Sequence, residues 1–267
     1  MSDVDVSFFG LQDEPFSVSP DPIYFYLSQL HRGILEKVRY VVRRRQGLVV
    51  LFGDVGTGKT SMAQLLYNRL SETNKVYYIP LPIYSSEMQM VKEIAGEFGI
   101  GPKISLLAQV KAIREHLIQL YSDGISPVLI IDEAQQLRGK QFEIIRQFSN
   151  FELPDTKLIQ MVLLGQSELR NKLRLKRALT SRIAITSTLE AFTPGDMNEM
   201  ISFRIQRAGG TSDIISNEAY LKTYDLSKGI PREAMHVLGL SLEIAFHNQQ
   251  KIITPDVVDL AYQEAHK

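Results

Sequence analysis

The chain has 267 residues, of which 44% are hydrophobic, enough for one large domain or for a core domain plus a small one. Thirty Lys and Arg residues balance thirty Asp and Glu residues, so the net charge gives no global argument for nucleic-acid binding, although it leaves room for a local basic surface. The lack of cysteine excludes disulfides and thiolate metal sites, and the acidic start at residues 1–5 is unlike a secretory signal. Because no apolar run approaches the roughly 18 residues of a membrane span, we expect a cytoplasmic protein.

A phosphate-binding loop is the most specific motif of the chain. Residues 53–60 fit G-x-x-x-x-G-K-[ST], and a predicted buried strand at 48–52 and a predicted helix at 61–70 supply the context that this motif requires. Lys59 would place a charge on the β- and γ-phosphates, and Thr60 would offer a hydroxyl to Mg²⁺. We therefore expect ATP and Mg²⁺ as ligands, and we expect the nucleotide to contact Gly53, Asp54, Val55, Gly56, Thr57, Gly58, Lys59, Thr60 and Ser61.

An acidic motif follows the apolar run at residues 127–131, where Asp132 and Glu133 end a predicted strand. Downstream of a phosphate-binding loop, this pattern predicts a Walker B motif. Asp132 would hold the Mg²⁺ through water or together with Thr60, and Glu133 would polarise the attacking water. A strand that ends in Asp-Glu also fits simple helix capping, and only the pairing with the loop favours the catalytic interpretation.

The remaining apolar runs predict strands at residues 76–79, 158–164 and 183–189. Helical segments alternate with them, at residues 86–98, 105–121, 139–149 and 167–180. This alternation predicts an α/β fold with a parallel sheet covered by helices on both faces. Ligands of such sheets bind at the carboxyl ends of the strands, where Thr60, Asp132 and the residues after Leu164 would converge.

From about residue 191 the pattern changes to helices only. Thr193 and Pro194 open the first of these helices, and three more are predicted at residues 216–227, 231–248 and 255–266. We therefore predict a nucleotide-binding core with its N-terminal arm at residues 1–190 and a helical lid domain at residues 191–267. Because the boundary is short, we expect the two domains to move as hinged neighbours.

Several stretches resemble the ExeA-type AAA+ ATPases, a family similar in turn to the TnsC- and MuB-type ATPases that regulate DNA transposition. The likeness covers nearly the whole chain and is carried by residues 9–11, 15–17, 19–22, 24–27, 163–169 and 229–232, together with the phosphate-binding loop. The resemblance implies a P-loop AAA+ core with a C-terminal helical lid, which hydrolyses ATP at the subunit interfaces of a ring or helical filament. Longer ExeA proteins also carry a membrane segment and a peptidoglycan-binding region, and this sequence shows neither.

The resemblance also implies three residue roles. Gln166 matches the sensor 1 position, which orients the attacking water, and Arg232 matches sensor 2, the lid residue that reports the γ-phosphate. Arg182 matches the arginine finger that completes a neighbouring subunit's site, with Arg177 as its competitor. In the family the arm at residues 15–26 lies over the adenine, while the residues alone also fit a clamp that packs the arm on the protein.

Two basic features bear on partners. Residues 43–45 are three consecutive arginines, and Arg170, Arg174 and Arg177 are spaced to share one helix face, which could track phosphates or could be a solvated face or a subunit contact. The loop at residues 99–103 could project into a ring's central channel or could be an ordinary turn between helices.

These features leave open what the nucleotide controls. We favour an ATP-driven oligomer that grips duplex DNA and recruits a transposase. The alternatives are a cytoplasmic assembly or secretion-type ATPase that acts on protein partners, and a slow nucleotide-dependent interaction switch. The intact Glu133 argues against the switch.

Overall fold

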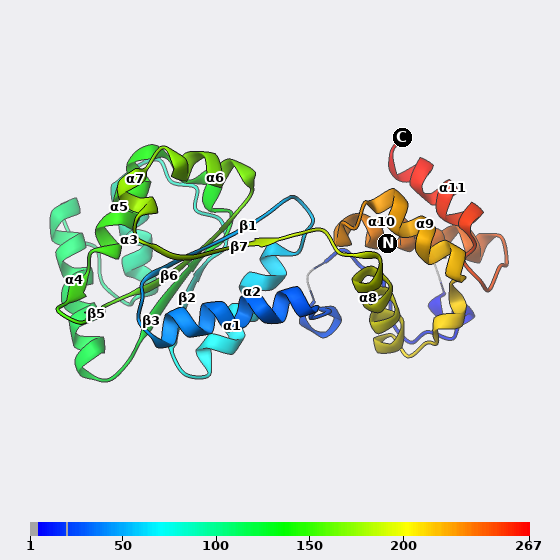
Figure 1. Cartoon of the computed structure of the whole chain (residues 1–267), viewed down its shortest axis with the longest axis horizontal. Helices are drawn as coiled ribbons and strands as arrows, with labels where there is room; N and C mark the ends of the chain where they lie inside the picture. Colours follow the sequence, from blue (N-terminus) through cyan, green and yellow to red (C-terminus); the bar gives the residue numbers. More distant parts are fainter. Residues whose placement is uncertain (1–4, 20) are drawn as a thin grey trace. The chain divides into compact units, whose positions relative to one another are not determined.

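The computed structural model describes residues 5–19 and 21–267. Residues 1–4 of the acidic start, and Pro20 of the stretch 19–22 that carries part of the family resemblance, therefore lie outside the described residues. Contacts divide the chain into two units (Figure 1). The core unit comprises Leu30–Val55 and Met62–Leu189, and the helical unit comprises the described residues up to Gln29, the short stretch Gly56–Ser61 and Glu190–Lys267.

The core unit is built on a five-stranded parallel sheet with the order β2-β3-β6-β1-β7. These strands are β1 (Leu48–Gly53), β2 (Lys75–Ile79), β3 (Pro127–Ile131), β6 (Gln160–Gly165) and β7 (Ile183–Leu189). Every residue of β1, β3 and β6 is buried, as expected of central strands that are covered on both faces. The predicted α/β class with a parallel sheet is therefore confirmed.

Helices cover the two faces of this sheet (Figure 1). One face packs against α1 (Gln29–Arg43) and α2 (Lys59–Ser71), and the alternate strand residues, Val49 and Leu51 among them, point into that cluster. The other face packs against the remaining helices of the core, which are α3 (Glu87–Glu97), α4 (Leu106–Ser122), α5 (Gly139–Ser149), α6 (Ser167–Arg174) and α7 (Arg177–Thr180). The period of two along each strand thus builds two separate apolar layers.

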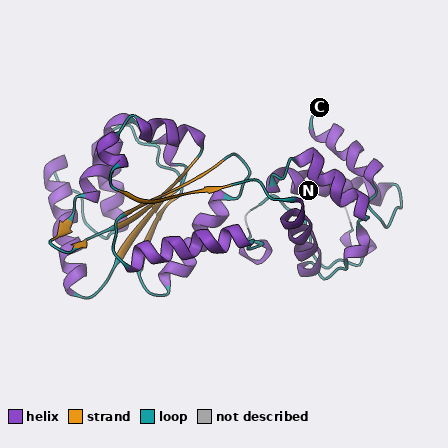
Figure 2. Cartoon of the chain, in the orientation of Figure 1, coloured by secondary structure: helices purple, strands orange, loops and turns teal. Residues whose placement is uncertain are grey.

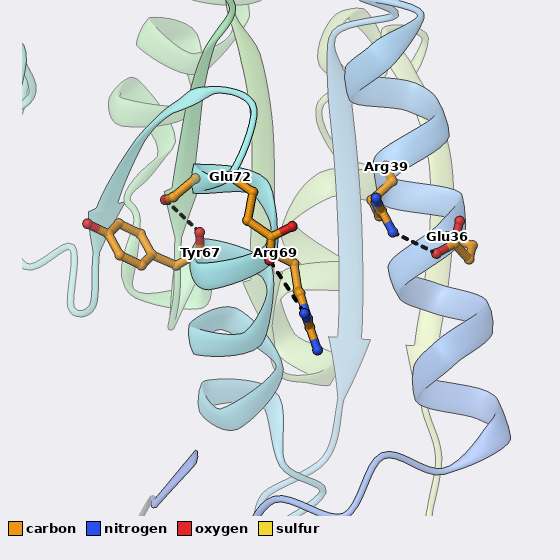
Figure 3. Close-up of polar contacts among 6 residues, drawn as sticks. Glu36, Arg39, Tyr67, Arg69 and Glu72 are labelled. Carbon is orange, nitrogen blue, oxygen red and sulfur yellow. Dashed lines mark hydrogen bonds and ion pairs between the residues drawn. The ribbon is translucent and has the colours of Figure 1, made fainter. Parts of the chain in front are cut away.

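The outward surfaces of α1 and α2 are polar. Glu36 and Arg39 form an ion pair of 3.1 Å on α1, and Arg69 pairs with Glu72 at 3.4 Å at the end of α2 (Figure 3). All four side chains are about half exposed or more, so these pairs contribute little to stability. The sequence analysis assigned no element to α1, although its buried positions have helical spacing.

The predicted helix at residues 167–180 is wrong in one respect, because the structure breaks it into α6 and α7. Leu169 and Leu173 of α6 are buried, but the next buried leucine is Leu179, six residues later, which a continuous helix would turn away from the core. The chain turns at residues 175–176 and restarts, which returns Leu179 to the core. The hydroxyl of Thr180 then donates to the carbonyl of Leu173 at 2.8 Å and fastens the turn.

That break corrects the predicted basic face, because Arg170 and Arg174 belong to α6 and Arg177 belongs to α7. The core unit also contains a hairpin that the sequence analysis did not predict, formed by β4 (Glu152–Leu153) and β5 (Thr156–Lys157).

The helical unit contains no strand among its described residues (Figure 2). Its helices are α8 (Pro194–Arg207), α9 (Asn217–Ser227), α10 (Pro231–His247) and α11 (Pro255–Ala265), with 3-10 turns at Val6–Phe9, Pro22–Tyr24 and Ser212–Ile214. Proline opens three of these helices, where its missing N–H costs nothing. None of the described helices of either unit is both long enough and apolar enough to cross a membrane.

The N-terminal arm belongs to the helical unit, whereas the sequence analysis placed it with the nucleotide-binding core. Phe9, Leu11, Phe16 and Tyr24 are buried in the same cluster as the apolar faces of α8 to α11. Leu11 fits because Gly210 has no side chain, since a Cβ there would lie 2.4 Å from a methyl group of Leu11. The arm thus supplies apolar surface that short amphipathic helices need for a core of their own.

Candidate functional site

The predicted site residues follow the carboxyl ends of neighbouring strands. β6 lies between β1 and β3, and all three run parallel, so their carboxyl ends share one edge of the sheet. Asp132 and Glu133 follow β3, Gln166 follows β6, and the phosphate-binding loop starts as β1 ends at Gly53. The topology therefore brings three of the predicted residues together and begins the loop at the same edge.

The phosphate-binding loop has the backbone that its glycines allow. Gly56 and Gly58 have φ angles of 82° and 89°, in the left-handed region that side chains disfavour. Thr57 and Lys59 are buried, and α2 begins at Lys59, with Thr60 and Ser61 in its first turn. The first N–H groups of a helix have no partner within the helix and favour an anion, so this segment suits a phosphate group.

The start of α10 lies against this loop within the helical unit. The backbone N–H of Arg232 donates to the carbonyl of Gly56 at 3.3 Å. A Cβ at Gly56 would lie 2.7 Å from Ile230 Cγ2, so glycine is needed there for close approach as well as for its φ angle. The structure thus places the predicted sensor 2 residue, Arg232, beside the phosphate-binding loop, with its side chain exposed.

Asp132 is 1% exposed, and several polar groups hold its carboxylate. Its Oδ1 accepts from the N–H of Glu133 at 2.8 Å, and the Tyr78 hydroxyl donates to its Oδ2 at 3.5 Å. Burial, and then the charge of Asp132, raise the pKa of Tyr78, which keeps that hydroxyl protonated as a donor. A buried carboxylate and the Thr60 hydroxyl are the hard oxygen ligands that Mg²⁺ prefers, so the residues present fit this ion.

Glu133 has an unusual backbone, with φ 48° and ψ 35° in the left-handed region. Its Oε2 accepts from the side-chain amide of Gln166 at 3.3 Å and also from the side-chain amide of Gln135. The Oε1 atom of Gln135 in turn accepts from the backbone N–H of Gln166 at 3.2 Å. Gln135 thus joins the predicted pair and was missed, because the expected motif ends at Glu133.

Arg182 lies at the opposite edge of the sheet. It precedes Ile183, which pairs with Leu48 at the start of β1, so the length of β1, about 17 Å at 3.3 Å per residue, separates it from the site edge. Its Nε is buried without a hydrogen-bond partner in the described chain. The pKa of Glu152 is lowered by Lys157 and, to a smaller extent, by the charge of Arg182. The structure does not bring Arg182 to the other site residues, and its competitor Arg177 is exposed at the start of α7.

Some arginines of the basic features pack against the protein itself. The guanidinium of Arg170 lies 4.5 Å from the ring centroid of Phe52 and donates to Thr188 Oγ1 at 3.1 Å. Arg45 lies over the ring of Tyr121 at 4.9 Å. Such contacts reduce the number of cations that are free to meet phosphates.

The loop at residues 99–103, the candidate channel loop, is a turn that side-chain hydrogen bonds hold in place. The side chain of Gln109, which is fully buried, accepts from the N–H of Lys103 at 2.6 Å and donates to the carbonyl of Gly101 at 3.3 Å. These bonds fix the loop to the start of α4. They favour the interpretation as an ordinary turn between helices.

A family model described as an AAA domain matches residues 42–173, a span that includes the phosphate-binding loop, Asp132, Glu133 and Gln166. The chain thus carries an AAA domain and has the AAA+ fold. It is 34% identical over 261 residues to General secretion pathway protein A of Aeromonas hydrophila, a match that covers 96% of this chain and 48% of that protein. The chain therefore spans about half the length of this relative, and the predicted resemblance to the ExeA-type family is confirmed.

Solved AAA+ structures share the fold. Cdc6p from Pyrobaculum aerophilum matches with a TM-score of 0.69 and 20% identity, over 99% of this chain and 72% of that one. The Drosophila ORC bound to DNA matches with a TM-score of 0.71 and 17% identity, over 100% of this chain and 68% of that one. At such identities the likeness shows the AAA+ fold alone.

Proposed function

We propose that this AAA+ chain hydrolyses ATP with Glu133 as the residue that activates water. The observation that carries the proposal is the placement of the Glu133 carboxylate directly after the buried Asp132, at the sheet edge where the phosphate-binding loop begins. When bound, Mg²⁺ and ATP supply a γ-phosphoryl group with its charge partly neutralised. The chain's residues have to hold these ligands and to position a water.

The roles of the residues follow from their chemistry. Backbone N–H groups from Gly53 to Ser61 and the ammonium of Lys59 bind phosphate oxygens, while Thr60 and Asp132 hold Mg²⁺. Glu133 takes a proton from water at its carboxylate, and the Gln166 amide, which already donates to Glu133, orients that water. Arg232 links the loop to α10 through its backbone contact with Gly56, so that the helical unit responds to the bound nucleotide.

We further propose that the chain works on a protein partner as a homo-oligomer, either a ring or a filament. The support is the relative named for the general secretion pathway, which matches over 96% of this chain. The DNA-binding transposition regulator that the sequence analysis favoured has less support, because its basic helix face does not exist as expected. Sedimentation with a non-hydrolysable ATP analogue separates the two functions, and we expect oligomers that form equally well with and without duplex DNA.

The hydrolysis proposal is tested by two substitutions. Lys59→Ala should abolish ATP binding, because the loop loses its point charge. Glu133→Gln should bind ATP, but its turnover should fall by about 10²- to 10⁴-fold. Nucleotide affinity is measured with a fluorescent analogue and turnover by phosphate release. Glu168→Gln, at an exposed carboxylate on α6, is the matched control and should keep both. Wild-type turnover by Glu133→Gln would reject the proposal.

A further inference from the structure

We propose that Gln135 is a positioning residue for ATP hydrolysis and that it acts by fixing the carboxylate of Glu133. The inference rests on the proposed role of Glu133. Gln135 lies in the 3-10 turn Ala134–Gln136 that follows the acidic pair, and its side chain is 7% exposed. Its amide nitrogen donates to Glu133 Oε2, while its amide oxygen accepts from the N–H of Gln166.

The position of Gln135 is itself fixed by neighbouring elements. Lys172 of α6 donates from Nζ to the carbonyl of Gln135 and to the carbonyl of Leu137 at 3.1 Å, and so holds the middle of the turn and the residue that follows it. A Cβ at Gly165 would lie 3.0 Å from Gln135 Oε1 and 2.6 Å from Leu169 Cδ2, so the absence of a side chain there leaves the space that the amide occupies. Such support is what a positioning group needs, because a small displacement of a reacting group costs much of its rate.

The geometry of the acceptor matters for the chemistry. The amides of Gln135 and Gln166 both donate to Oε2 of Glu133. Fixing one carboxylate oxygen in this way orients the other, Oε1, as the proton acceptor for water. Neither amide gains or loses a proton, and Gln135 acts only by holding the carboxylate.

The test compares three substitutions in the full chain. Gln135→Met keeps the length of the side chain and removes both hydrogen bonds, while Gln135→Glu keeps an acceptor for the N–H of Gln166 and sets a like charge beside Glu133. We expect both to lower kcat by about 10- to 100-fold, the range for losing a hydrogen bond to a charged group, with unchanged affinity for the ATP analogue. Gln136→Met changes the exposed neighbouring glutamine and should leave kcat unchanged.

A double-mutant cycle shows whether Gln135 acts through Glu133. In the Glu133→Gln background, Gln135→Met should have no further effect on the single-turnover rate of hydrolysis. If Gln135 had a merely structural role, the two substitutions would lower this rate independently of each other. Full activity of Gln135→Met, or restored activity of Gln135→Glu, would overturn the inference while Glu133→Gln stays inactive. Wild-type turnover by Glu133→Gln would instead reject the proposed function, and this inference with it.

Discussion

Gly229 lies two residues before α10, in a backbone conformation that lets a neighbouring segment approach closely. Its φ angle is 75°, and a Cβ there would lie 2.4 Å from the carbonyl oxygen of Phe192. The backbone N–H of Phe192 donates to the carbonyl of Gly229 at 2.8 Å, so the two segments approach as closely as backbones can. This single position therefore sets where the start of α10, and with it Arg232, can lie.

We predict that Gly229→Ala destabilises the helical unit by about 1–3 kcal/mol or more, because the left-handed conformation is strained and the carbonyl cannot retreat. Hydrogen exchange read out by mass spectrometry resolves the effect to α8 and α10. Gly33→Ala is the matched control. Gly33 lies inside α1 with open space around it, so alanine there should stabilise the protein by about 0.5–1 kcal/mol. Equal effects of the two alanines would contradict this explanation.

Among single residues, the sequence was sufficient to predict the position of those that directly follow a strand. The convergence of Asp132 and the residues after Leu164 could be predicted, because parallel strands bring their carboxyl ends to one edge, while the choice of Gln166 came from the family resemblance. Gln135 could not be predicted, because its contact depends on the left-handed backbone of Glu133 and on the missing side chain of Gly165, and neither follows from a hydrophobic pattern. A glutamine two residues after the acidic pair was the available signal.

Among the elements, the N-terminal arm supplies buried side chains to the apolar core of the helical unit. Its contact with α8 includes a buried arginine, since the guanidinium of Arg204 donates to the carbonyl of Ser17 at 3.1 Å and lies over the ring of Tyr24 at 5.3 Å. Burial, and then the hydrogen bond and charge of Asp13, raise the pKa of Tyr24 to about 12. The tyrosine stays protonated and donates to Asp13 at 2.8 Å, which joins two parts of the arm to each other.

We predict that Leu11→Ala destabilises the helical unit by about 2–5 kcal/mol, because it leaves a cavity beside Gly210 in a small core. Val18→Ala, at a residue of the same arm that is 52% exposed, should change stability by less than about 0.5 kcal/mol. Urea unfolding monitored by hydrogen exchange gives both values. A loss of protection confined to the core unit in Leu11→Ala would contradict the assignment of the arm.

Helices and strands were predicted best where hydrophobic residues recur along the sequence with a clear period. All five strands of the main sheet were expected, but α1 was missed despite its regular apolar spacing. The break between α6 and α7 was not predictable from period alone, because the stretch reads as one helix until the burial of Leu179 is known. The assignment of the arm likewise required knowledge of which apolar cluster it joins.

At the scale of the whole molecule, the position of Arg182 bears on assembly. It lies at the amino ends of the strands, the length of β1 away from the edge that carries Glu133. Within one chain it therefore cannot serve the same site. A catalytic role therefore requires that Arg182 contributes to the active site of a neighbouring copy of the chain, as the family resemblance implied.

We predict that Arg182→Ala binds ATP normally and loses about 10³-fold or more of its hydrolysis. Mixing it with equal amounts of Lys59→Ala protein should restore activity at about a quarter of the boundaries, where an intact site meets an intact Arg182. Phosphate release from the mixture measures this recovery. Arg177→Ala is the matched comparison. If only Arg177→Ala loses hydrolysis and recovers it in the mixture, the arginine finger is Arg177. Loss of ATP affinity in isolated Arg182→Ala protein would indicate a structural role.

The composition of the helical unit also constrains how the chain folds during its synthesis. The arm leaves the ribosome before α8 to α11, and the helices that bury Phe9, Leu11 and Phe16 begin about 180 residues later, which corresponds to roughly nine to thirty-six seconds of translation. Throughout that interval these side chains have no native partners, while the entire parallel sheet is being made beside them. We expect the nascent arm to be the part of this protein that most needs shielding by chaperones.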